Sequence, residues 1–325
     1  MEDPLNLFYL TGMQLSSGKL LLSSQAALLL VDGRYVGAAQ LQAPVPVQLE
    51  EKFSLTSFLK THHLKKLLFD PTATSYARFL QLKEHRPLPR AELFKTLRFV
   101  KDASEIAALK KSAALAWQGF EYIKKSLKVG VTEKELAKRF ELFSLKNGAD
   151  KLSFDPIIAF GAHGAMPHYR PGNTKLKEGD AVLIDIGVVL NHYHSDMTRV
   201  VFFKHKDPYL NSLYTLVKQA HKKALELCKP GTPLKALDHA ARDVFKRENL
   251  EHLFIHALGH GIGLQTHEFP RIKEGGEEEN TLLESGMVLT IEPGLYVPGK
   301  GGVRHEDTLV ITPSGFTNFY KGALG

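Results

Sequence analysis

The sequence predicts a mixed α/β protein with two domains, and three observations support this prediction. The chain has 325 residues, a length that suggests two domains more than one or three. Residues 1–95 read as short apolar runs separated by turns, whereas the later part alternates long amphipathic helices with strand-rich stretches. The segment 85–90 carries two prolines and no periodic pattern, as linkers do. We therefore expect a small α/β domain over 1–95 and a larger domain over 96–325.

Apolar runs of strand length follow one another in the first domain. Leu20–Leu22 and Ala27–Val31 are two such runs, the second followed by the turn signal Asp32–Gly33. A third run at Leu67–Phe69 precedes a helical pattern at Ser75–Leu82. This succession of strands and helices is typical of a small α/β domain.

Capping residues predict where the helices of the second domain begin. Asp102 and Glu105 form a capping box, and Thr132 and Glu135 form another. Two later helices are expected to begin at pairs of a cap residue and a proline, Asp207–Pro208 and Thr232–Pro233.

The second domain contains an internal repeat. The turn between two helices at 128–132 recurs at 229–233, and the apolar strand at 181–185 recurs at 287–292. A glycine stands six positions before the acidic residue of each strand, at Gly179 and Gly286. We therefore expect two related helix–helix–strand halves that close around a shared site.

Composition excludes several classes of protein. The net charge of +7 comes from lysines scattered along helix faces, without a basic stripe and interleaved aromatics, so we do not expect nucleic-acid binding. No stretch approaches the ~20 apolar residues of a membrane span. The first residues are acidic where a signal peptide would be basic, and the one cysteine, Cys228, lies in an apolar helical pattern. We expect a cytoplasmic protein with Cys228 in its core.

Two carboxylates interrupt apolar strands of the second domain. Asp185 lies within 182–190 and Glu292 ends 288–292. Burial of a charged carboxylate is costly unless an ion pair, a shifted pKa or a metal ion compensates it, and for either residue alone a salt bridge is as good an explanation as a metal. Each, however, is followed after a hairpin-sized gap by another carboxylate, Asp196 or Glu306. Antiparallel strands would bring these pairs together, and their mutual repulsion calls for cations.

Two divalent ions would balance the charge of four carboxylates. His260 can supply an imidazole ligand, and its glycine neighbours allow close backbone approach. Oxygen ligands with one imidazole favour Mn²⁺, Co²⁺ or Fe²⁺, with Zn²⁺ as an alternative. His256 and His260 have the spacing of a helical zinc site, but Ala257 stands where H-E-x-x-H has its glutamate. The glycines around His260 are only a weak nucleotide-loop signal.

The four carboxylates and His260 lie in motifs that resemble those of the pita-bread metallopeptidases. This family contains methionine aminopeptidase, aminopeptidase P and prolidase. The motifs are IDIG, SDMTR, GHGIG, IEPG and VRHED, and the resemblance covers nearly the whole chain. It implies a pseudo-twofold pita-bread domain with two divalent metal ions per subunit. It also implies that Asp196 and Glu306 bridge both ions, that Asp185 binds one, and that His260 and Glu292 bind the other.

The resemblance assigns further residues to the substrate. His168 and His267 match histidines that lie near the peptide, although a surface loop would also accommodate them. Arg304 matches an arginine that orients a carboxylate or contacts substrate, and a plain salt bridge explains it equally well. His256 matches no firm role. Glu292 is the candidate for carrying a proton to the leaving proline nitrogen, with help from His168 and His267.

The first domain narrows the family to its proline-specific branch. Residues 6–12 and 28–35 resemble the N-terminal domain of the proline-specific members and creatinase, which methionine aminopeptidases generally lack. Relatives usually carry a strand and a helix before this motif, so we expect a domain trimmed at its start. The resemblance also implies a homodimer.

We expect an Xaa-Pro aminopeptidase that cleaves the bond between an N-terminal residue and a following proline, using a hydroxide held between the two metal ions. Peptides with proline in second position are the expected substrates. An Xaa-Pro dipeptidase (prolidase) is the alternative, and the sequence does not identify the residues that separate the two. A non-catalytic peptide-binding module and a creatinase-like amidinohydrolase are less favoured, because the ligand set is complete.

Overall fold

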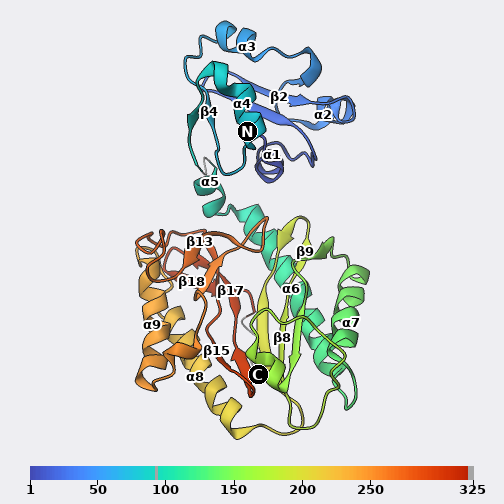
Figure 1. Ribbon diagram of the computed structural model, residues 1–325, viewed down its shortest axis with the longest axis vertical. Helices are drawn as coiled ribbons and strands as arrows, with labels where there is room; N and C mark the ends of the chain where they lie inside the picture. The colour runs from blue at the N-terminus through green and yellow to red at the C-terminus, as the bar shows by residue number, and fades with distance from the viewer. Residues whose placement is uncertain (92–93, 321–325) are drawn as a thin grey trace. The chain divides into compact units, whose positions relative to one another are not determined.

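The computed structural model describes residues 1–91 and 94–320, and the chain forms two compact units, Met1–Leu97 and Arg98–Gly325. Both units mix helices and strands, as the sequence predicts (Figure 1). Helix α5 (Lys95–Phe99) contains the division between them. No helix among the described residues is both long and apolar enough to cross a bilayer.

The first unit is built on a three-stranded sheet in the order β1-β2-β3. Strand β1 (Lys19–Leu22) is antiparallel to β2 (Ala27–Val31), which is parallel to β3 (Val47–Leu49). Two short strands, β4 (Leu68–Phe69) and β5 (Leu88–Pro89), pair in parallel, so part of the segment predicted as a linker forms a strand. The helices are α1 (Pro4–Thr11), α2 (Val36–Gln42), α3 (Leu55–Thr61) and α4 (Tyr76–Leu82).

The first half of the second unit starts with two helices and ends in a sheet. Helices α6 (Ala103–Lys125) and α7 (Glu133–Lys146) begin at the two predicted capping boxes. The sheet has the order β11-β8-β7, all antiparallel, with β7 (Ile157–Phe160), β8 (Ala181–Ile186) and β11 (Met197–Phe202). A smaller sheet contains β6 (Lys151–Leu152), β9 (Val188–Leu190) and β10 (Tyr193–His194).

The second half repeats this order. Helices α8 (Pro208–Leu225) and α9 (Leu234–Arg247) precede a five-stranded sheet, β13-β12-β14-β17-β18. Its strands are β12 (Gly259–Gly261), β13 (Glu268–Ile272), β14 (Val288–Ile291), β17 (Asp307–Thr312) and β18 (Gly315–Asn318). A hairpin, β15 (Gly294–Val297) with β16 (Gly301–Arg304), lies between β14 and β17 in the chain.

Cap geometry agrees with the sequence at three helices and differs at one. Asp207 caps α8 with Pro208 at its first position, as predicted. For α9, however, Pro233 itself is the N-cap, one residue later than predicted. Pro233 has extended backbone angles because it forms a β-bridge with Leu282, and so it stays outside the helix.

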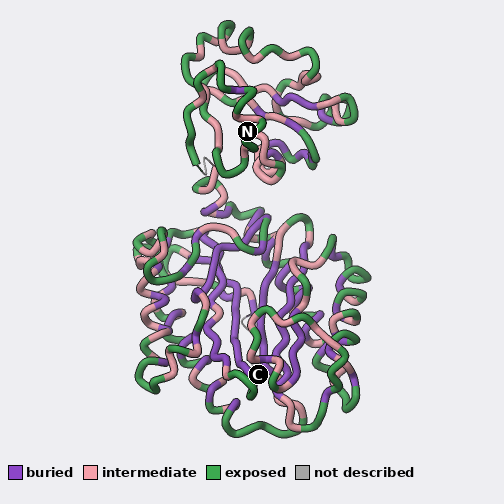
Figure 2. The backbone as a smooth tube through the Cα atoms, viewed as in Figure 1, coloured by how far each residue is buried: buried purple, intermediate pink, exposed green. Residues whose placement is uncertain are grey.

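The two halves match at their turns and share a core between outer helices. Gly179 and Gly286 both have positive φ angles, 88° and 94°, which glycine adopts without strain. Helices α6 and α7 lie on one side of the strands and α8 and α9 on the other, and the strands between them are mostly buried (Figures 1 and 2). Cys228 is buried there as predicted. A β-bridge between Thr198 and Glu306 joins the sheets of the two halves.

Candidate metal centre

A cavity of about 580 Å³ lies in the second unit, and its wall contains every site residue that the sequence predicts. These residues are Asp185, Asp196, His260, Glu292, Glu306, His168, His267 and Arg304. Residues from 154 to 306, drawn from both halves, meet in this one cavity. The predicted closure of two halves around a shared site therefore agrees with the structure.

Strand pairing brings each carboxylate pair together. Strands β8 and β11 are antiparallel with Asp185 opposite Thr198, which places Asp196 just beyond the end of the pairing. In the second half, β14 and β17 pair Ile291 with Asp307, so Glu292 and Glu306 leave the sheet next to each other. The hairpin-sized gaps in the sequence predicted this arrangement.

His260 faces the carboxylates from β12. Its Nε2 lies 3.7 Å from Asp196 Oδ2 and 3.6 Å from Glu292 Oε1. Asp196, His260 and Glu306 each offer one ligand atom, all within 4.8 Å of one another. His260 Nδ1 lies 2.9 Å from the carbonyl oxygen of Gly261, so Nδ1 carries the proton and the Nε2 lone pair is free for a cation.

Burial changes the acid–base chemistry of the cluster. It raises the pKa of Glu306 to about 8, with the Asp185 charge adding to the effect. Burial, followed by the charge of Glu306, also raises the pKa values of Asp196 and Glu292 well above their usual range. The pKa of His260 falls to about 3, first through burial and then through His267. A neutral imidazole next to crowded carboxylates is a set of ligands suited to divalent cations.

Arg304 forms an ion pair and also orients the Asp185 carboxylate. Its guanidinium donates to Asp185 Oδ2, to the Tyr296 hydroxyl at 2.8 Å and to Thr198 Oγ1 at 3.0 Å. The other oxygen of Asp185, Oδ1, is buried and has no hydrogen-bond partner within the described part of the chain. A buried carboxylate oxygen without a hydrogen-bond partner is suited to bind a metal ion.

His267 and His256 lie in the same cavity wall. The His267 ring is 4.4 Å from the ring of His260, edge to face, and burial lowers its pKa. His256, which the sequence left without a role, bonds through Nε2 to the Tyr296 hydroxyl at 2.8 Å. It therefore supports the tyrosine that holds Arg304.

Sequence reasoning missed several residues of the site. Arg271 on β13 lines the cavity, and Tyr296 on β15 connects Arg304 with His256. A second buried cluster, next to Glu306 in the chain, joins Arg199 to Asp307 at 2.5 Å, and His221 and His305 lie within 4 Å of Asp307. Arg271 follows His267 by four positions, but nothing in its spacing distinguishes it from a solvated arginine.

The metal-free protein should lose stability as the pH rises above neutrality. Glu306 has a folded-state pKa of about 8 against a reference of 4.5, so its folding contribution is present at low pH and is lost as the pH rises through about 8. Buried histidines act in the opposite sense only below their reference value of 6.5. Between pH ~7 and ~8.5 we expect the unfolding free energy to fall by about 1–3 kcal/mol.

Denaturant unfolding of chelator-treated protein across this interval measures the effect. Protein reloaded with Mn²⁺ is the control, and its stability should change much less, because bound cations keep the carboxylates ionised. An unfolding free energy that rises over the same interval in the metal-free protein would contradict the assignment of raised pKa values.

The chain matches two family models that together span most of its length. Residues 107–313 match metallopeptidase family M24, and residues 1–101 match the creatinase/prolidase N-terminal domain. The first match covers the whole candidate metal centre. The pita-bread architecture that the sequence predicted for the second domain is therefore confirmed.

Individual relatives agree with these matches. The chain is 34% identical to the Xaa-Pro dipeptidase of Pyrococcus furiosus over 326 aligned positions, which cover 99% of this chain and 92% of that protein. The structure of the Xaa-Pro dipeptidase from Bacillus anthracis superposes with a TM-score of 0.93 at 31% identity, over 98% of this chain and 91% of that one.

An X-Pro aminopeptidase from Thermotoga maritima MSB8 superposes with a TM-score of 0.89 at 28% identity, over 98% of this chain and 92% of that one. Both kinds of peptidase thus share this architecture. The family matches and the identity over nearly the full length lead to one assignment: the chain belongs to metallopeptidase family M24 and is a hydrolase.

Proposed function

We propose that this hydrolase is an Xaa-Pro dipeptidase, and one cationic side chain of the cavity carries the proposal. Arg271 lines the cavity and is solvent-exposed, and its guanidinium has no ion pair or hydrogen bond within the described residues. By contrast, Arg304 is paired with Asp185. A guanidinium without a partner in a substrate cavity is suited to form a bidentate ion pair with a carboxylate. The free carboxylate of a dipeptide is the group that a longer peptide lacks at this position.

The relatives favour the same activity. The curated relative at 34% identity is a dipeptidase, and the solved structure at 31% identity is another. The sequence alone led us to prefer the aminopeptidase, and these relatives support its alternative, the dipeptidase, better. The Thermotoga aminopeptidase is nearly as similar in fold, so the fold by itself does not decide between them.

Within this proposal, two divalent ions would be held by Asp185, Asp196, His260, Glu292 and Glu306. The family resemblance implies that Asp196 and Glu306 would contact both ions, and the side chains of both residues are buried. The unpartnered Asp185 Oδ1 and the raised carboxylate pKa values support this occupancy. Oxygen ligands with a single imidazole favour Mn²⁺, with Co²⁺, Fe²⁺ and Zn²⁺ as alternatives.

When bound, the ions would lower the pKa of a water molecule and polarise the scissile carbonyl. Residues of the chain would bind the substrate, orient a carboxylate and transfer a proton. His168 and His267, which both line the cavity, would hydrogen-bond the peptide and the developing oxyanion. Arg304 fixes the orientation of Asp185. Glu292 is the proposed carrier of a proton to the leaving proline nitrogen, its two oxygens lying 3.6 Å from His260 Nε2 and 3.9 Å from His256 Nδ1.

Assembly and location belong to the proposal as well. A homodimer follows from the resemblance to the proline-specific peptidases, and sedimentation equilibrium that returns the 36.2 kDa of one chain would contradict it. A cytoplasmic location agrees with a single buried cysteine. Fractionation that recovers the protein outside the cytoplasm would contradict that part.

An Xaa-Pro dipeptide and an Xaa-Pro-Yaa tripeptide, assayed side by side with Mn²⁺-loaded protein, test the function. We expect higher kcat/KM on the dipeptide. Arg271→Met should raise KM for the dipeptide by about 10- to 100-fold, because a charge-assisted bond worth about 1.5–3 kcal/mol is lost. The tripeptide should respond much less.

Lys273→Met is the matched control, since Lys273 is exposed two positions further on and does not line the cavity. Its kinetic constants should equal those of the wild type. Equal or better cleavage of the tripeptide would favour the aminopeptidase. No turnover of either peptide with full metal content would favour a binding module.

A further inference from the structure

Glu133, outside the cavity, is a buried carboxylate with an unusual number of partners. It is the first residue of α7, and its side chain is 0% exposed. Its Oε1 accepts from the backbone N–H of Phe160 at 2.9 Å and from His163 Nδ1 at 2.8 Å. Its Oε2 accepts from the Tyr169 hydroxyl at 2.7 Å and from the backbone N–H of Gly172 at 3.1 Å. These four donors satisfy a charge that would otherwise be costly to bury.

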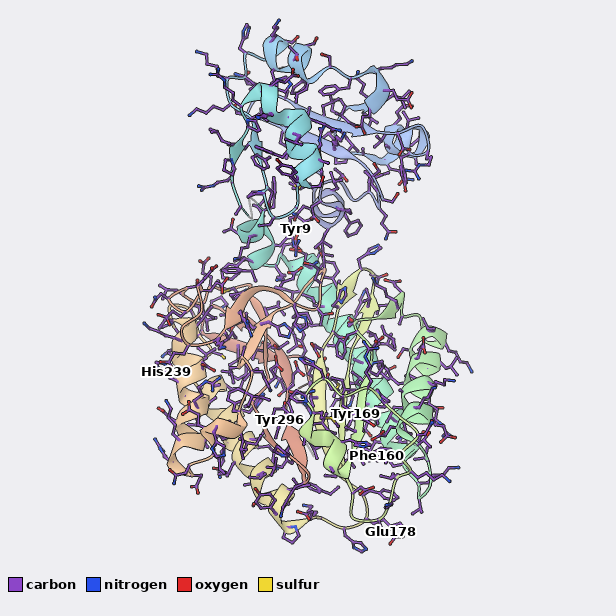
Figure 3. All side chains as sticks on the ribbon, viewed as in Figure 1. Tyr9, Phe160, Tyr169, Glu178, His239 and Tyr296 are labelled. Atoms are coloured by element: carbon purple, nitrogen blue, oxygen red, sulfur yellow. The ribbon has the colours of Figure 1, made fainter. Side chains whose placement is uncertain are left out.

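All four donors belong to one segment, 160–172, that forms part of the cavity wall. The segment leaves β7 at Phe160 and carries Pro167, His168, Tyr169 and Arg170 into the cavity wall. Two donors precede His168 in the chain and two follow it. Glu133 therefore hydrogen-bonds the segment on both sides of this histidine. Tyr169 and Phe160 are labelled in Figure 3, in the same half of the unit.

Two further contacts hold the segment in the same conformation. The rings of His163 and Tyr169 stack with centroids 4.5 Å apart, although the two residues are six positions apart in the chain. Burial and the bond to Glu133 raise the pKa of Tyr169 to about 12, so its hydroxyl remains a donor at neutral pH. A Cβ on Gly172 would lie 3.1 Å from the Tyr169 oxygen, so the absence of a side chain there permits the close approach.

The far side of the segment packs on β16. A Cβ on Gly164 would lie only 3.0 Å from the backbone nitrogen of Gly302, and β16 ends at Arg304. The segment is thus held between a buried carboxylate of the first half and a strand of the second. Neither contact involves a proposed metal ligand.

We propose that Glu133 is a positioning residue, which places His168 at the substrate through its four hydrogen bonds to residues 160–172. The inference rests on the proposed function, because it needs His168 to act on the peptide. A carboxylate is required at this position because both of its oxygens accept two hydrogen bonds. Glutamine would turn an NH₂ group toward two of the donors and release one end of the segment.

The variant Glu133→Gln tests the proposal, with Glu135→Gln as its matched control. Glu135 lies two positions further along α7 and is exposed, and among the described residues its side chain accepts only from Thr132 in the helix cap. We expect Glu133→Gln to lower kcat/KM on an Xaa-Pro dipeptide on the order of 10- to 100-fold, the scale of a misplaced catalytic group. Metal content should be unchanged. Glu135→Gln should lower thermal stability slightly and leave the kinetic constants unchanged.

A double-mutant cycle with His168→Ala separates positioning from general destabilisation. If Glu133 acts by placing His168, then Glu133→Gln should change kcat/KM by less than about threefold in the His168→Ala background. The same fold loss in both backgrounds would overturn the proposal, as would full activity of His168→Ala. His163→Phe keeps the stacked ring but removes one donor, and it should show a smaller loss that disappears in the same background. This milder variant serves if Glu133→Gln does not fold.

Hydrogen exchange gives a readout that does not depend on turnover. Amides within 161–172 should exchange faster in Glu133→Gln than in wild type, whereas Glu135→Gln should affect only the start of α7. Unchanged protection of 161–172 would overturn the proposal. Failure of the proposed function is a separate result, namely that the wild-type protein with its metal cleaves no Xaa-Pro dipeptide.

Discussion

Replacement of Asp196 by asparagine should abolish peptidase activity without unfolding the protein. Asp196 is buried and lies with His260 and Glu306 within reach of one ion, so its loss removes a proposed bridge between two metals. Metal ions typically stabilise the transition state by several kcal/mol, so their loss should lower kcat/KM by at least about 10³-fold. Metal content, measured by atomic emission after dialysis, should fall together with activity.

In the metal-free state, the Asp196→Asn substitution should not lower the stability of the protein and can raise it. Burial and the charges of Glu306, Asp185 and Glu292 raise the pKa of Asp196, so its carboxylate opposes folding when no cation is present. Metal-free Asp196→Asn should therefore unfold at the same or a higher temperature than metal-free wild type. Full activity of this variant, or full metal content without activity, would contradict the bridging role.

Asp150→Asn is the matched control for Asp196→Asn. Asp150 is exposed, does not line the cavity, and accepts one bond from the backbone N–H of His192 at 3.0 Å. The same change from carboxylate to amide at this position should leave both metal content and activity as in wild type.

Arg199→Met should destabilise the protein by about 3–5 kcal/mol, the usual effect of removing one partner of a buried ion pair. Arg199 bonds Asp307 at 2.5 Å, with side chains only 6% and 1% exposed. Its guanidinium also donates to the carbonyl oxygens of Thr198 at 2.9 Å and Glu306 at 2.5 Å, where the two half-sheets meet. Denaturant unfolding of the metal-free proteins measures the difference.

The pH dependence of this stability difference tests whether the Arg199–Asp307 ion pair causes it. Burial opposes the ionisation of Asp307, but the charges of Arg199, His221 and His305 outweigh it and hold its pKa at about 2. The stability that this pair provides is present above the reference value of 3.8 and is lost as the pH falls through about 2. The difference between wild type and variant should therefore shrink as the pH drops from ~4 to ~2.

An exposed ion pair provides the control for Arg199→Met. Lys204 pairs with Glu178, and their side chains are 50% and 48% exposed. Lys204→Met should cost at most about 1 kcal/mol. A loss of that small size in Arg199→Met would show that the buried pair does not hold the two halves together.

The five proposed metal ligands could be found in the sequence for a local physical reason. A carboxylate inside an apolar strand is exceptional, and Asp185 and Glu292 are visible as exceptions without any structure. Antiparallel hairpins have predictable lengths, so Asp196 and Glu306 could be paired with them. The fold class was predictable for a similar reason, because capping boxes and apolar periodicity are local signals.

Residues whose role depends on distant partners could not be found in this way. Arg271 is an ordinary charged residue in the sequence, and only the cavity shows that it lacks a partner there. Glu133 resembles any first-turn glutamate, yet its partners lie 27 to 39 positions away. For Arg304 the sequence left three explanations, and the structure gives an ion pair that also orients Asp185.

The sequence by itself therefore determined the family, the two-domain α/β class and the residues that converge on the cavity, because each depends on patterns within one strand or helix. Tertiary structure alone decided which polar groups are buried without partners and which are paired across the two halves. That distinction depends on desolvation and on contacts between distant segments, as at Asp185 Oδ1 and at Glu133. Neither desolvation nor long-range pairing is encoded in local spacing.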